Sequence, residues 1–314
     1  MLKVAVIGCG NISGSHVPNW MKMENVRLTA VCDLERDRTE RWLAKYPDLH
    51  IYTDYAEMMD QEKPDILDIC LPTYLHVQYA EDAMRRGAHV LCEKPVGLTE
   101  DEAKSVYRTA RETGRLFMVA QVLRFWNEYK YLKDVIETGR FGALHYGRMY
   151  RNGGYPKTSW HGWMMKNELS RMVLLDRHIH DLDFLVYAMG KPEHFDVFRR
   201  TKGVEDILTV IYRYGDAFVN AESTWYLQED VPFTAGYFFA FDKASLDYDG
   251  KKLTVYPAEG GSFCPLNRNN AYETEIRYFA ECVEQDRPIT MVTEESLLAV
   301  MNVVDAIDGR KVRI

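Results

Sequence analysis

Val4-Ala5-Val6-Ile7-Gly8-Cys9-Gly10-Asn11-Ile12-Ser13, near the start of the 314-residue chain, joins a short apolar run to a turn with two glycines. The apolar run predicts a buried strand, and a helix is expected to follow the glycines. Gly8 would permit the sharp turn, and Gly10 would let a pyrophosphate approach the backbone without an intervening Cβ atom. Ser13 stands at the third glycine position of this dinucleotide-binding pattern, where a small residue is needed for helix packing.

Asp33 ends the second predicted strand, 20 residues after Ser13. An acid at this spacing typically accepts a hydrogen bond from the 2′-hydroxyl of the adenosine ribose. Its negative charge would repel a 2′-phosphate, which favours NAD over NADP. Arg36 and Arg38 follow closely, and an arginine in this loop can pair with a 2′-phosphate, so NADP is the alternative cofactor.

The hydrophobic pattern divides the chain into two halves. Residues 1–122 alternate apolar runs with amphipathic stretches, which predicts an α/β fold, here a doubly wound parallel sheet forming a dinucleotide-binding Rossmann domain. Residues 123–314 are predicted to form an α+β domain for substrate binding and oligomerisation, with a large mixed, mostly antiparallel sheet. Strands are expected in this half at 206–214, 217–225, 237–241 and 253–256, and helices at 129–137, 179–189, 273–284 and 294–307.

Composition excludes several classes of protein. The formal net charge of −8 disfavours a nucleic-acid partner, which would require clustered lysine and arginine. No apolar run approaches the roughly 18 residues that a membrane span requires, and no secretory signal pattern precedes the first strand, so we expect a cytoplasmic protein that does not enter membranes. The six cysteines include no closely spaced pair, which argues against a zinc site or a disulfide framework.

Glu93-Lys94-Pro95 directly follows a predicted buried strand. Doubly wound sheets bind their ligands at this edge. The Lys94 ammonium could therefore hydrogen-bond a substrate hydroxyl and stabilise charge on its oxygen as a hydride leaves. A surface lysine beside a proline turn is an equally good interpretation of this fragment alone.

Asp176-Arg177-His178-Ile179-His180-Asp181-Leu182-Asp183 is the second candidate site. On a helix, Asp176, His180 and Asp183 would share one face, so His180 is a candidate general base between two carboxylates. A metal site using His178 and His180 is an alternative, but residues i and i+2 diverge by about 200° on a helix. A purely structural polar cluster is the other alternative. We predict no metal site.

Taken together and in this order, these motifs resemble those of the glucose–fructose oxidoreductase, inositol dehydrogenase and rhizopine catabolism (Gfo/Idh/MocA) family of NAD(P)-dependent oxidoreductases. The resemblance extends over essentially the whole chain, through the segments Val4 to Ile12, Pro72 to His76, Glu93 to Pro95 and Leu175 to Asp183. It implies hydride transfer between a nicotinamide and a secondary alcohol or ketone of a sugar, sugar derivative or cyclic polyol. It also implies a homodimer or homotetramer.

The resemblance assigns roles to individual residues. The family's catalytic lysine, aspartate and histidine correspond to Lys94, Asp176 and His180. The expected cofactor-binding residues are Gly8, Gly10, Asn11, Ile12, Asp33, Arg38, Leu71, Pro72, Thr73, His76, Glu93, Lys94 and Gln121. The expected substrate-binding residues are Lys94, Arg124, Trp163, Asp176 and His180.

The chain departs from the family pattern near the second candidate site. Glycines often precede the aspartate, whereas this chain reads Leu169-Ser170-Arg171-Met172-Val173-Leu174. His178 replaces a frequent glycine, so an extra imidazole is expected to point toward the substrate. Two other functions stay open: a redox-neutral enzyme that uses bound NAD transiently for glycoside cleavage or epimerisation, and a non-catalytic NAD-responsive binding protein.

Overall fold

The computed structural model describes residues 1–309, which form two compact units. The first unit comprises Met1–Val122 and Asn270–Glu294. The second comprises Leu123–Asn269 and, among the described residues, 295–309. The sequence interpretation placed the helix near residues 273–284 with the second domain, but helix α9 (Ala271–Glu284) packs against α1 (Ser13–Trp20) in the first unit. An apolar stripe on a helix shows that one face is buried but does not identify its partner.

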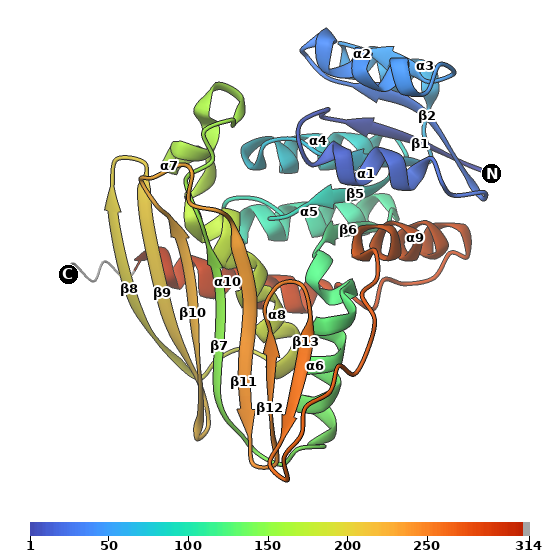
Figure 1. Ribbon diagram of the computed structural model, residues 1–314. Helices are drawn as coiled ribbons and strands as arrows, with labels where there is room; N and C mark the ends of the chain where they lie inside the picture. The colour runs from blue at the N-terminus through green and yellow to red at the C-terminus, as the bar shows by residue number, and fades with distance from the viewer. Residues whose placement is uncertain (310–314) are drawn as a thin grey trace. The chain divides into compact units, whose positions relative to one another are not determined.

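The first unit is built on a six-stranded parallel sheet in the order β3-β2-β1-β4-β5-β6 (Figure 1). Its strands are β1 (Leu2–Ile7), β2 (Val26–Cys32), β3 (His50–Tyr52), β4 (Ile66–Ile69), β5 (His89–Glu93) and β6 (Phe117–Ala120). This is the Rossmann strand order, with a topological switch point between β1 and β4. The predicted doubly wound sheet is confirmed.

Helices cover both faces of the sheet, and all of them except α9 connect its strands. Besides α1 and α9, they are α2 (Arg36–Lys45), α3 (Tyr55–Glu62), α4 (His76–Arg85) and α5 (Glu100–Thr113). The central strands are continuously buried, as β4 shows at all four of its residues. Parallel sheets covered on both sides have this continuous apolar pattern, which is why the strands could be recognised in the sequence.

The second unit contains a seven-stranded sheet in the order β13-β12-β11-β7-β10-β9-β8. Its strands are β7 (Leu144–Asn152), β8 (His194–Lys202), β9 (Glu205–Tyr214), β10 (Ala217–Trp225), β11 (Thr234–Phe241), β12 (Ala244–Tyr248) and β13 (Leu253–Pro257). Only the β7–β10 pair is parallel, so the predicted mixed, mostly antiparallel sheet is confirmed.

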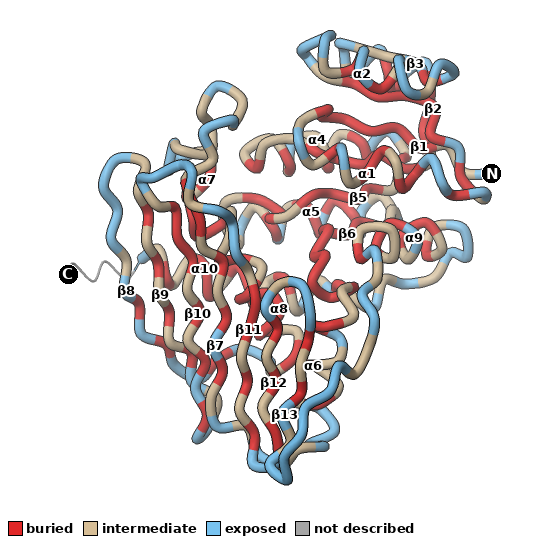
Figure 2. Tube along the Cα trace, viewed as in Figure 1, coloured by how far each residue is buried: buried red, intermediate tan, exposed pale blue. Residues whose placement is uncertain are grey.

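Helices cover one face of this second sheet. They include α6 (Asn127–Thr138), α8 (Ile179–Met189) and α10 (Glu294–Gly309), and the short α7 (Asn167–Ser170) precedes α8. Buried and more exposed residues alternate along the strands, as the colours in Figure 2 show. Alternation is expected when one face of a sheet packs on helices and the other remains open.

Within residues 1–309, no helix combines the length and the apolar character needed to cross a membrane. All six cysteines are free thiols; Cys264 is exposed and the other five are buried.

Candidate functional site

The predicted cofactor-binding residues gather along one edge of the first sheet. Gly8 follows β1, Asp33 follows β2, and Leu71 lies two residues beyond β4. Glu93 ends β5, and Gln121 follows β6. Because the strands are parallel, their carboxyl ends share one edge, and such sheets bind ligands there. The fold therefore brings together residues that are separated by more than a hundred positions in the chain.

The glycine turn has the shape that a pyrophosphate requires. Gly8 has a φ of +92°, and a Cβ atom on it would lie 2.5 Å from the carbonyl oxygen of Cys70. Nothing lies within 4 Å of the place where a Cβ of Gly10 would stand. Asn11 and Ile12 lead into α1, whose N-terminus has no side-chain cap. The amide groups of this first helical turn can therefore face an anion.

Asp33 is fixed beside this turn by two backbone groups. Its Oδ2 accepts a hydrogen bond of 2.7 Å from the Cys9 amide, and its Oδ1 accepts one of 2.9 Å from the Glu35 amide. Each carboxylate oxygen has a second lone pair, so the half-buried group can still accept a ribose hydroxyl proton. These residues fit an adenosine ribose next to a pyrophosphate.

An arginine that sequence reasoning missed contacts the glycine turn. One guanidinium nitrogen of Arg41 donates to the carbonyl oxygens of Cys9 (2.6 Å) and Gly10 (2.7 Å) and to the Ser13 hydroxyl (2.7 Å). The predicted Arg38 instead lies 3.8 Å from the Glu35 carboxylate. Arg41 comes three residues after Arg38 on α2, so helical spacing could have identified it as a member of the same face.

His76 holds two turns together. Its Nδ1 is 2.7 Å from the Pro95 carbonyl oxygen, and its Nε2 is 2.8 Å from the Leu71 carbonyl oxygen. The residue is 1% exposed and both ring nitrogens contact backbone carbonyl groups; that it lines the cofactor cleft stays a prediction. We assign it the role of joining the turn after β4, with half-buried Pro72 and buried Thr73, to the turn after β5.

Glu93 also points into the protein. Its Oε1 lies 2.9 Å from His16 Nε2, and its Oε2 accepts a hydrogen bond of 3.1 Å from the Lys94 amide. Both carboxylate oxygens are thus engaged by the protein, and a direct contact with the cofactor is not supported. Lys94 itself is half-buried, at the carboxyl edge where it was predicted.

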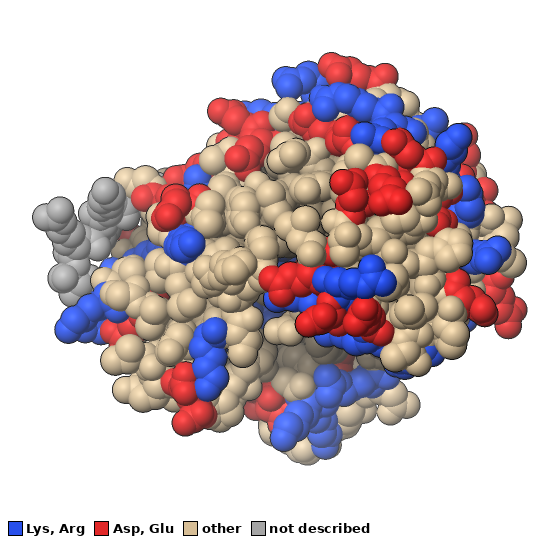
Figure 3. Space-filling model, turned by 90° about the horizontal axis from the view of Figure 1, so that it is seen from above, with Lys and Arg blue, Asp and Glu red and all other residues tan. Residues whose placement is uncertain are grey.

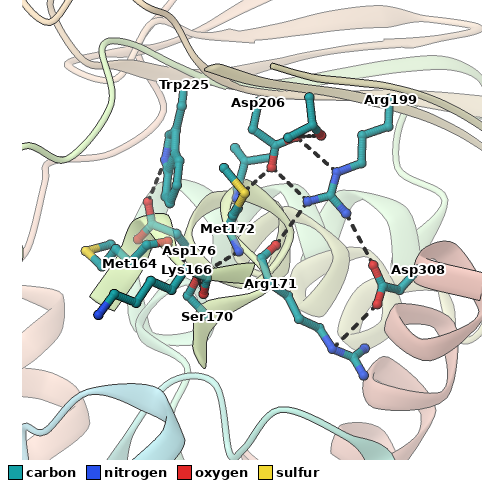
Figure 4. Close-up of polar contacts among 12 residues, drawn as sticks. Met164, Lys166, Ser170, Arg171, Met172, Asp176, Arg199, Asp206, Trp225 and Asp308 are labelled. Carbon is teal, nitrogen blue, oxygen red and sulfur yellow. Dashed lines mark hydrogen bonds and ion pairs between the residues drawn. The ribbon is translucent and has the colours of Figure 1, made fainter. Parts of the chain in front are cut away.

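In the second unit, Asp176 and His180 belong to a helical segment that is otherwise almost completely buried. Among residues 172–186, only Asp176, Arg177 and His180 are not buried. Asp176 lies in a π-helical turn (Leu174–His178), and its carboxylate accepts a hydrogen bond of 3.0 Å from Trp225 Nε1 (Figure 4). His180 lies in the first turn of α8. π-helical turns occur frequently at functional sites.

The third polar residue of this segment has a structural role. The Arg177 guanidinium donates to the carbonyl oxygens of Gly153 (3.1 Å), Gly154 (2.8 Å) and Thr224. It thereby attaches the π-helical turn to the sheet. Asp176 and His180 are left as the half-buried acid and base of the segment.

Asp183 does not lie with Asp176 and His180. This corrects the prediction that the three side chains share one face of a helix. Asp183 is fully buried and forms two hydrogen bonds with Arg124, of 2.9 and 2.6 Å. Arg124 is 1% exposed and also donates to the Ser296 hydroxyl (3.0 Å). The prediction that Arg124 binds substrate is therefore not supported, since its charge is neutralised inside the second unit.

His178 is a neutral core histidine. It is fully buried, with Nδ1 at 3.2 Å from the Ser223 hydroxyl and Nε2 at 2.7 Å from the Tyr212 hydroxyl. Burial, with a smaller effect of the nearby Arg199 charge, lowers the pKa of His178 to about 3. The expectation that this imidazole points toward the substrate is therefore wrong.

The glycine-free segment before Asp176 adopts an unusual backbone. Arg171 and Met172 have φ angles of +52° and +54°, a region that glycine adopts more easily than other residues. Asp206 accepts a hydrogen bond of 3.1 Å from the Val173 amide, and Arg199 donates to the Arg171 carbonyl oxygen at 3.1 Å (Figure 4). Arg199 and Asp206 are themselves paired at 2.8 Å. This ion pair, in which Asp206 is fully buried and Arg199 half-buried, fixes the entrance to the π-helical turn.

Trp163, a predicted substrate-binding residue, is half-buried in a 3₁₀ segment (Trp160–Met165) of the second unit. The segment is tied to the turn before Asp176 because the Ser170 hydroxyl bonds to the Met164 carbonyl oxygen (2.6 Å) and the Lys166 carbonyl oxygen (3.1 Å). This connection places Trp163 in the same part of the second unit as Asp176. A contact between Trp163 and substrate stays a prediction.

Charged side chains of both signs share the surface. On the face shown in Figure 3, lysine and arginine side chains lie next to aspartate and glutamate side chains. Among the described residues, charged side chains also form ion pairs, such as Arg86 with Asp82 (2.7 Å) and Arg111 with Glu294 (2.5 Å). The basic groups on that face do not form one continuous surface.

The strand order, the glycine turn and the acid at the end of β2 define a nucleotide-binding Rossmann protein with a second, mixed-sheet unit. Residues 2–121 match the model of an oxidoreductase family with an NAD-binding Rossmann fold, and residues 129–241 match the GFO/IDH/MocA C-terminal domain. The chain belongs to the Gfo/Idh/MocA family.

Relatives of known name have several activities. The chain is 29% identical over 194 residues to D-glucoside 3-dehydrogenase from Escherichia coli K12, over 61% of this chain and 55% of that protein. It is 31% identical over 187 residues to 2,7-anhydro-N-acetylneuraminate hydratase from Mediterraneibacter gnavus, over 59% of this chain and 49% of that protein. The matches span about half the length of these curated relatives.

The fold is shared with a levoglucosan dehydrogenase whose structure was solved with NADH and levoglucosan. The two structures superpose with a TM-score of 0.83 at 18% identity, over 98% of this chain and 96% of the other.

The two glycines of the turn allow a direct test of the phosphate cradle. Gly8→Ala should lower the melting temperature without cofactor, because its positive φ costs roughly 1–2 kcal/mol for other residues and its Cβ would collide with Cys70. Gly10→Ala should leave that temperature unchanged but weaken NAD binding about tenfold or more, since its Cβ would occupy the open space. Thermal unfolding and calorimetric titration measure both effects; normal NAD binding by Gly10→Ala would contradict the assignment.

The neutral state of His178 predicts how stability depends on pH. Below its ordinary pKa of 6.5, the unfolded chain binds a proton that the folded protein does not bind, so the free energy of unfolding falls as the pH falls toward 3. Between about pH 7.5 and 5.5 this contributes about 1.4 kcal/mol. In denaturant unfolding, the free energy of unfolding of His178→Gln should fall by about 1.4 kcal/mol less than that of the parent protein over this pH range. The exposed control His194→Gln should show the same fall as the parent protein.

Proposed function

We propose that the chain is an NAD(P)-dependent oxidoreductase that transfers a hydride between the nicotinamide and a secondary alcohol or ketone of a sugar, sugar derivative or cyclic polyol. The observation that carries the proposal is the glycine turn with Asp33 fixed beside it, in a chain that also presents Asp176 and His180 together. Two of the proteins it resembles are named as dehydrogenases of a glucoside and of levoglucosan, which supports a carbohydrate substrate.

The chain's own residues would supply acid–base chemistry and charge. A bound nicotinamide would supply the hydride chemistry. His180 would take the proton from the reacting hydroxyl, and the Lys94 ammonium would stabilise negative charge on that oxygen. Asp176, held by Trp225, would orient the substrate and the imidazole.

We propose NAD as the preferred cofactor and NADP as the alternative. The fixed Asp33 carboxylate supports NAD, because it would repel a 2′-phosphate. Arg41 is the group that could bind a 2′-phosphate, since its guanidinium already contacts the glycine turn.

A redox-neutral reaction is the second candidate function. The relative from Mediterraneibacter gnavus is named as a hydratase, and hydration involves no net oxidation. In such a reaction the bound NAD would oxidise the sugar transiently and be regenerated within each turnover.

A panel of sugars and polyols, each with NAD and NADP in parallel, tests these proposals. We expect reduced cofactor to accumulate with at least one substrate, faster with NAD, as measured by absorbance. Product formation without net accumulation would support the redox-neutral reaction instead. Turnover of none of the panel, by either readout, would argue against both.

His180→Ala should separate catalysis from binding. Loss of the general base should lower kcat about 10²–10⁴-fold, while the Kd for NAD should stay within about twofold. Steady-state kinetics and calorimetry give the two quantities. Equal losses in both would mean that His180 has a structural role.

We also propose a cytoplasmic homo-oligomer. Free cysteines support a reducing compartment, and three exposed aromatic residues, Phe198, Phe218 and Tyr256, support an interface on the open face of the second sheet. Light scattering should detect a dimer or tetramer, and Phe218→Asp should shift it toward monomer. The exposed loop residue Leu227, changed to Asp, is the control; unchanged assembly of Phe218→Asp would argue against this interface.

A further inference from the structure

Three buried ionisable side chains meet beneath the carboxyl edge of the first sheet. His16 comes from α1, Asp68 from β4 and Glu93 from the end of β5. His16 Nδ1 lies 2.8 Å from Asp68 Oδ2, and His16 Nε2 lies 2.9 Å from Glu93 Oε1. The side chains of His16 and Asp68 are fully buried, and that of Glu93 is 9% exposed. We call this arrangement the Asp68–His16–Glu93 chain.

The geometry requires His16 to be an imidazolium. Each of its ring nitrogens faces a carboxylate, which can only accept a hydrogen bond when ionised. Burial alone would lower the pKa of His16, but the negative charge of Asp68 outweighs burial and holds this pKa well above its ordinary value. Burial alone would raise the pKa of Glu93, but the hydrogen bond and the charge of His16 lower it.

The other titratable groups around the Asp68–His16–Glu93 chain are two cysteines, Lys94, His76 and Tyr272 of α9, whose ring centroid lies 6.1 Å from that of His16. Cys70 faces His16 and Asp68, and burial raises the pKa of its thiol to about 12, so it is neutral. Cys92 is likewise buried with a raised pKa. Lys94 and His76 are the remaining charged or titratable groups near Glu93. The Asp68–His16–Glu93 chain therefore contains two carboxylates and one imidazolium, with Lys94 as the neighbouring cation.

The Asp68–His16–Glu93 chain links α1 to the backbone of Lys94. At one end, Asp68 Oδ2 also accepts a hydrogen bond of 2.7 Å from Trp20 Nε1, in the last turn of α1. At the other end, Glu93 Oε2 accepts the Lys94 amide proton at 3.1 Å. Since α1 begins at the glycine turn, these contacts connect the phosphate cradle to the lysine through side chains inside one compact unit.

Stability alone does not account for such a chain. Buried ion pairs add little net stability compared with apolar side chains of similar volume, whereas loss of one partner typically costs about 3–5 kcal/mol. Strongly perturbed ionisable groups at a ligand-binding edge are instead typical of functional sites. Because Glu93 contacts the Lys94 amide, Lys94 is the functional residue to which the Asp68–His16–Glu93 chain is connected.

We propose that His16 is a positioning residue for Lys94, acting through Glu93: the imidazolium fixes the Glu93 carboxylate, and that carboxylate fixes the backbone from which the Lys94 ammonium extends. The inference rests on the proposed function, because it takes Lys94 as the group that contacts the substrate oxygen. A misplacement of about 1 Å in such a group can lower a rate about 10²-fold.

A double-mutant cycle tests the route through Glu93. His16→Gln and Glu93→Gln should each lower kcat about 10–100-fold, with the Kd for NAD changed less than about threefold. The double variant should be no slower than the slower single variant, because both changes break one connection. His89→Gln, at the amino end of the same strand β5, is the matched control and should keep the parent rate. Multiplicative losses would overturn the proposal.

Two spectroscopic readouts do not depend on turnover. In full-length protein saturated with NAD, ¹⁵N NMR should find protons on both His16 ring nitrogens at neutral pH, and Asp68→Asn should lower the pKa of His16. In protein with ¹³C-methylated lysines, the Lys94 signal, identified by its absence in Lys94→Arg, should shift in His16→Gln but not in His89→Gln.

These readouts separate the two proposals. If Lys94→Arg leaves sugar turnover unchanged, the proposed function of Lys94 fails, although its NMR signal would still respond to His16. If the Lys94 signal is the same in His16→Gln as in the parent protein, the positioning role fails, whatever the turnover. His16, Asp68 and Cys70 also have metal-binding atoms within 4.8 Å of one another, so stoichiometric metal bound there, with His16 Nδ1 unprotonated, would equally overturn the proposal.

Discussion

Parallel strands impose one constraint on which the rest of the site depends: every loop that leaves a carboxyl end emerges at the same edge of the sheet. The glycine turn, Asp33 and Lys94 come from three different strands, yet this constraint alone places them along one edge. The buried Asp68–His16–Glu93 chain then adds side-chain contacts to what topology arranges. A cofactor cradle and a charged group for chemistry can thus be held together by one sheet, before any other part of the chain contributes.

The second unit uses ion pairs to place its helices. Arg124 with Asp183 joins the segment after β6 to α8, and Arg199 with Asp206 supports the left-handed backbone at Arg171. A related chain with glycines at this position would adopt that backbone at lower conformational cost. Here the hydrogen bonds to Asp206 and Arg199 offset the cost, so the same approach to Asp176 is reached with larger side chains.

Sequence patterns predicted the elements whose burial is periodic and missed those whose polar residues are hidden by tertiary contacts. Helix α8 and strands β9 and β10 were predicted almost to their ends, because one face of each is regularly apolar. In the second unit, strands β7, β8 and β12 were missed, because charged residues interrupt the apolar pattern of β7 and β8 and β12 is only five residues long. Motifs located Gly8, Asp33 and Lys94 correctly at the carboxyl edge, but they could not reveal that His76, Glu93 and Arg124 face inward. A side chain's direction depends on partners that lie far away in the chain, and the π-helical turn before α8 also changes the spacing assumed for Asp183.

The path of the chain has a practical consequence for dissecting this protein. Helix α9 completes the first unit by burying Ile276 and Phe279 beside α1, although some 150 residues separate it from the last strand of that unit. A fragment truncated after residue 122 would expose the apolar surface that α9 covers and would be prone to aggregate. An isolated nucleotide-binding module would therefore have to be spliced, with residues 270–294 rejoined to residue 122 through an artificial linker.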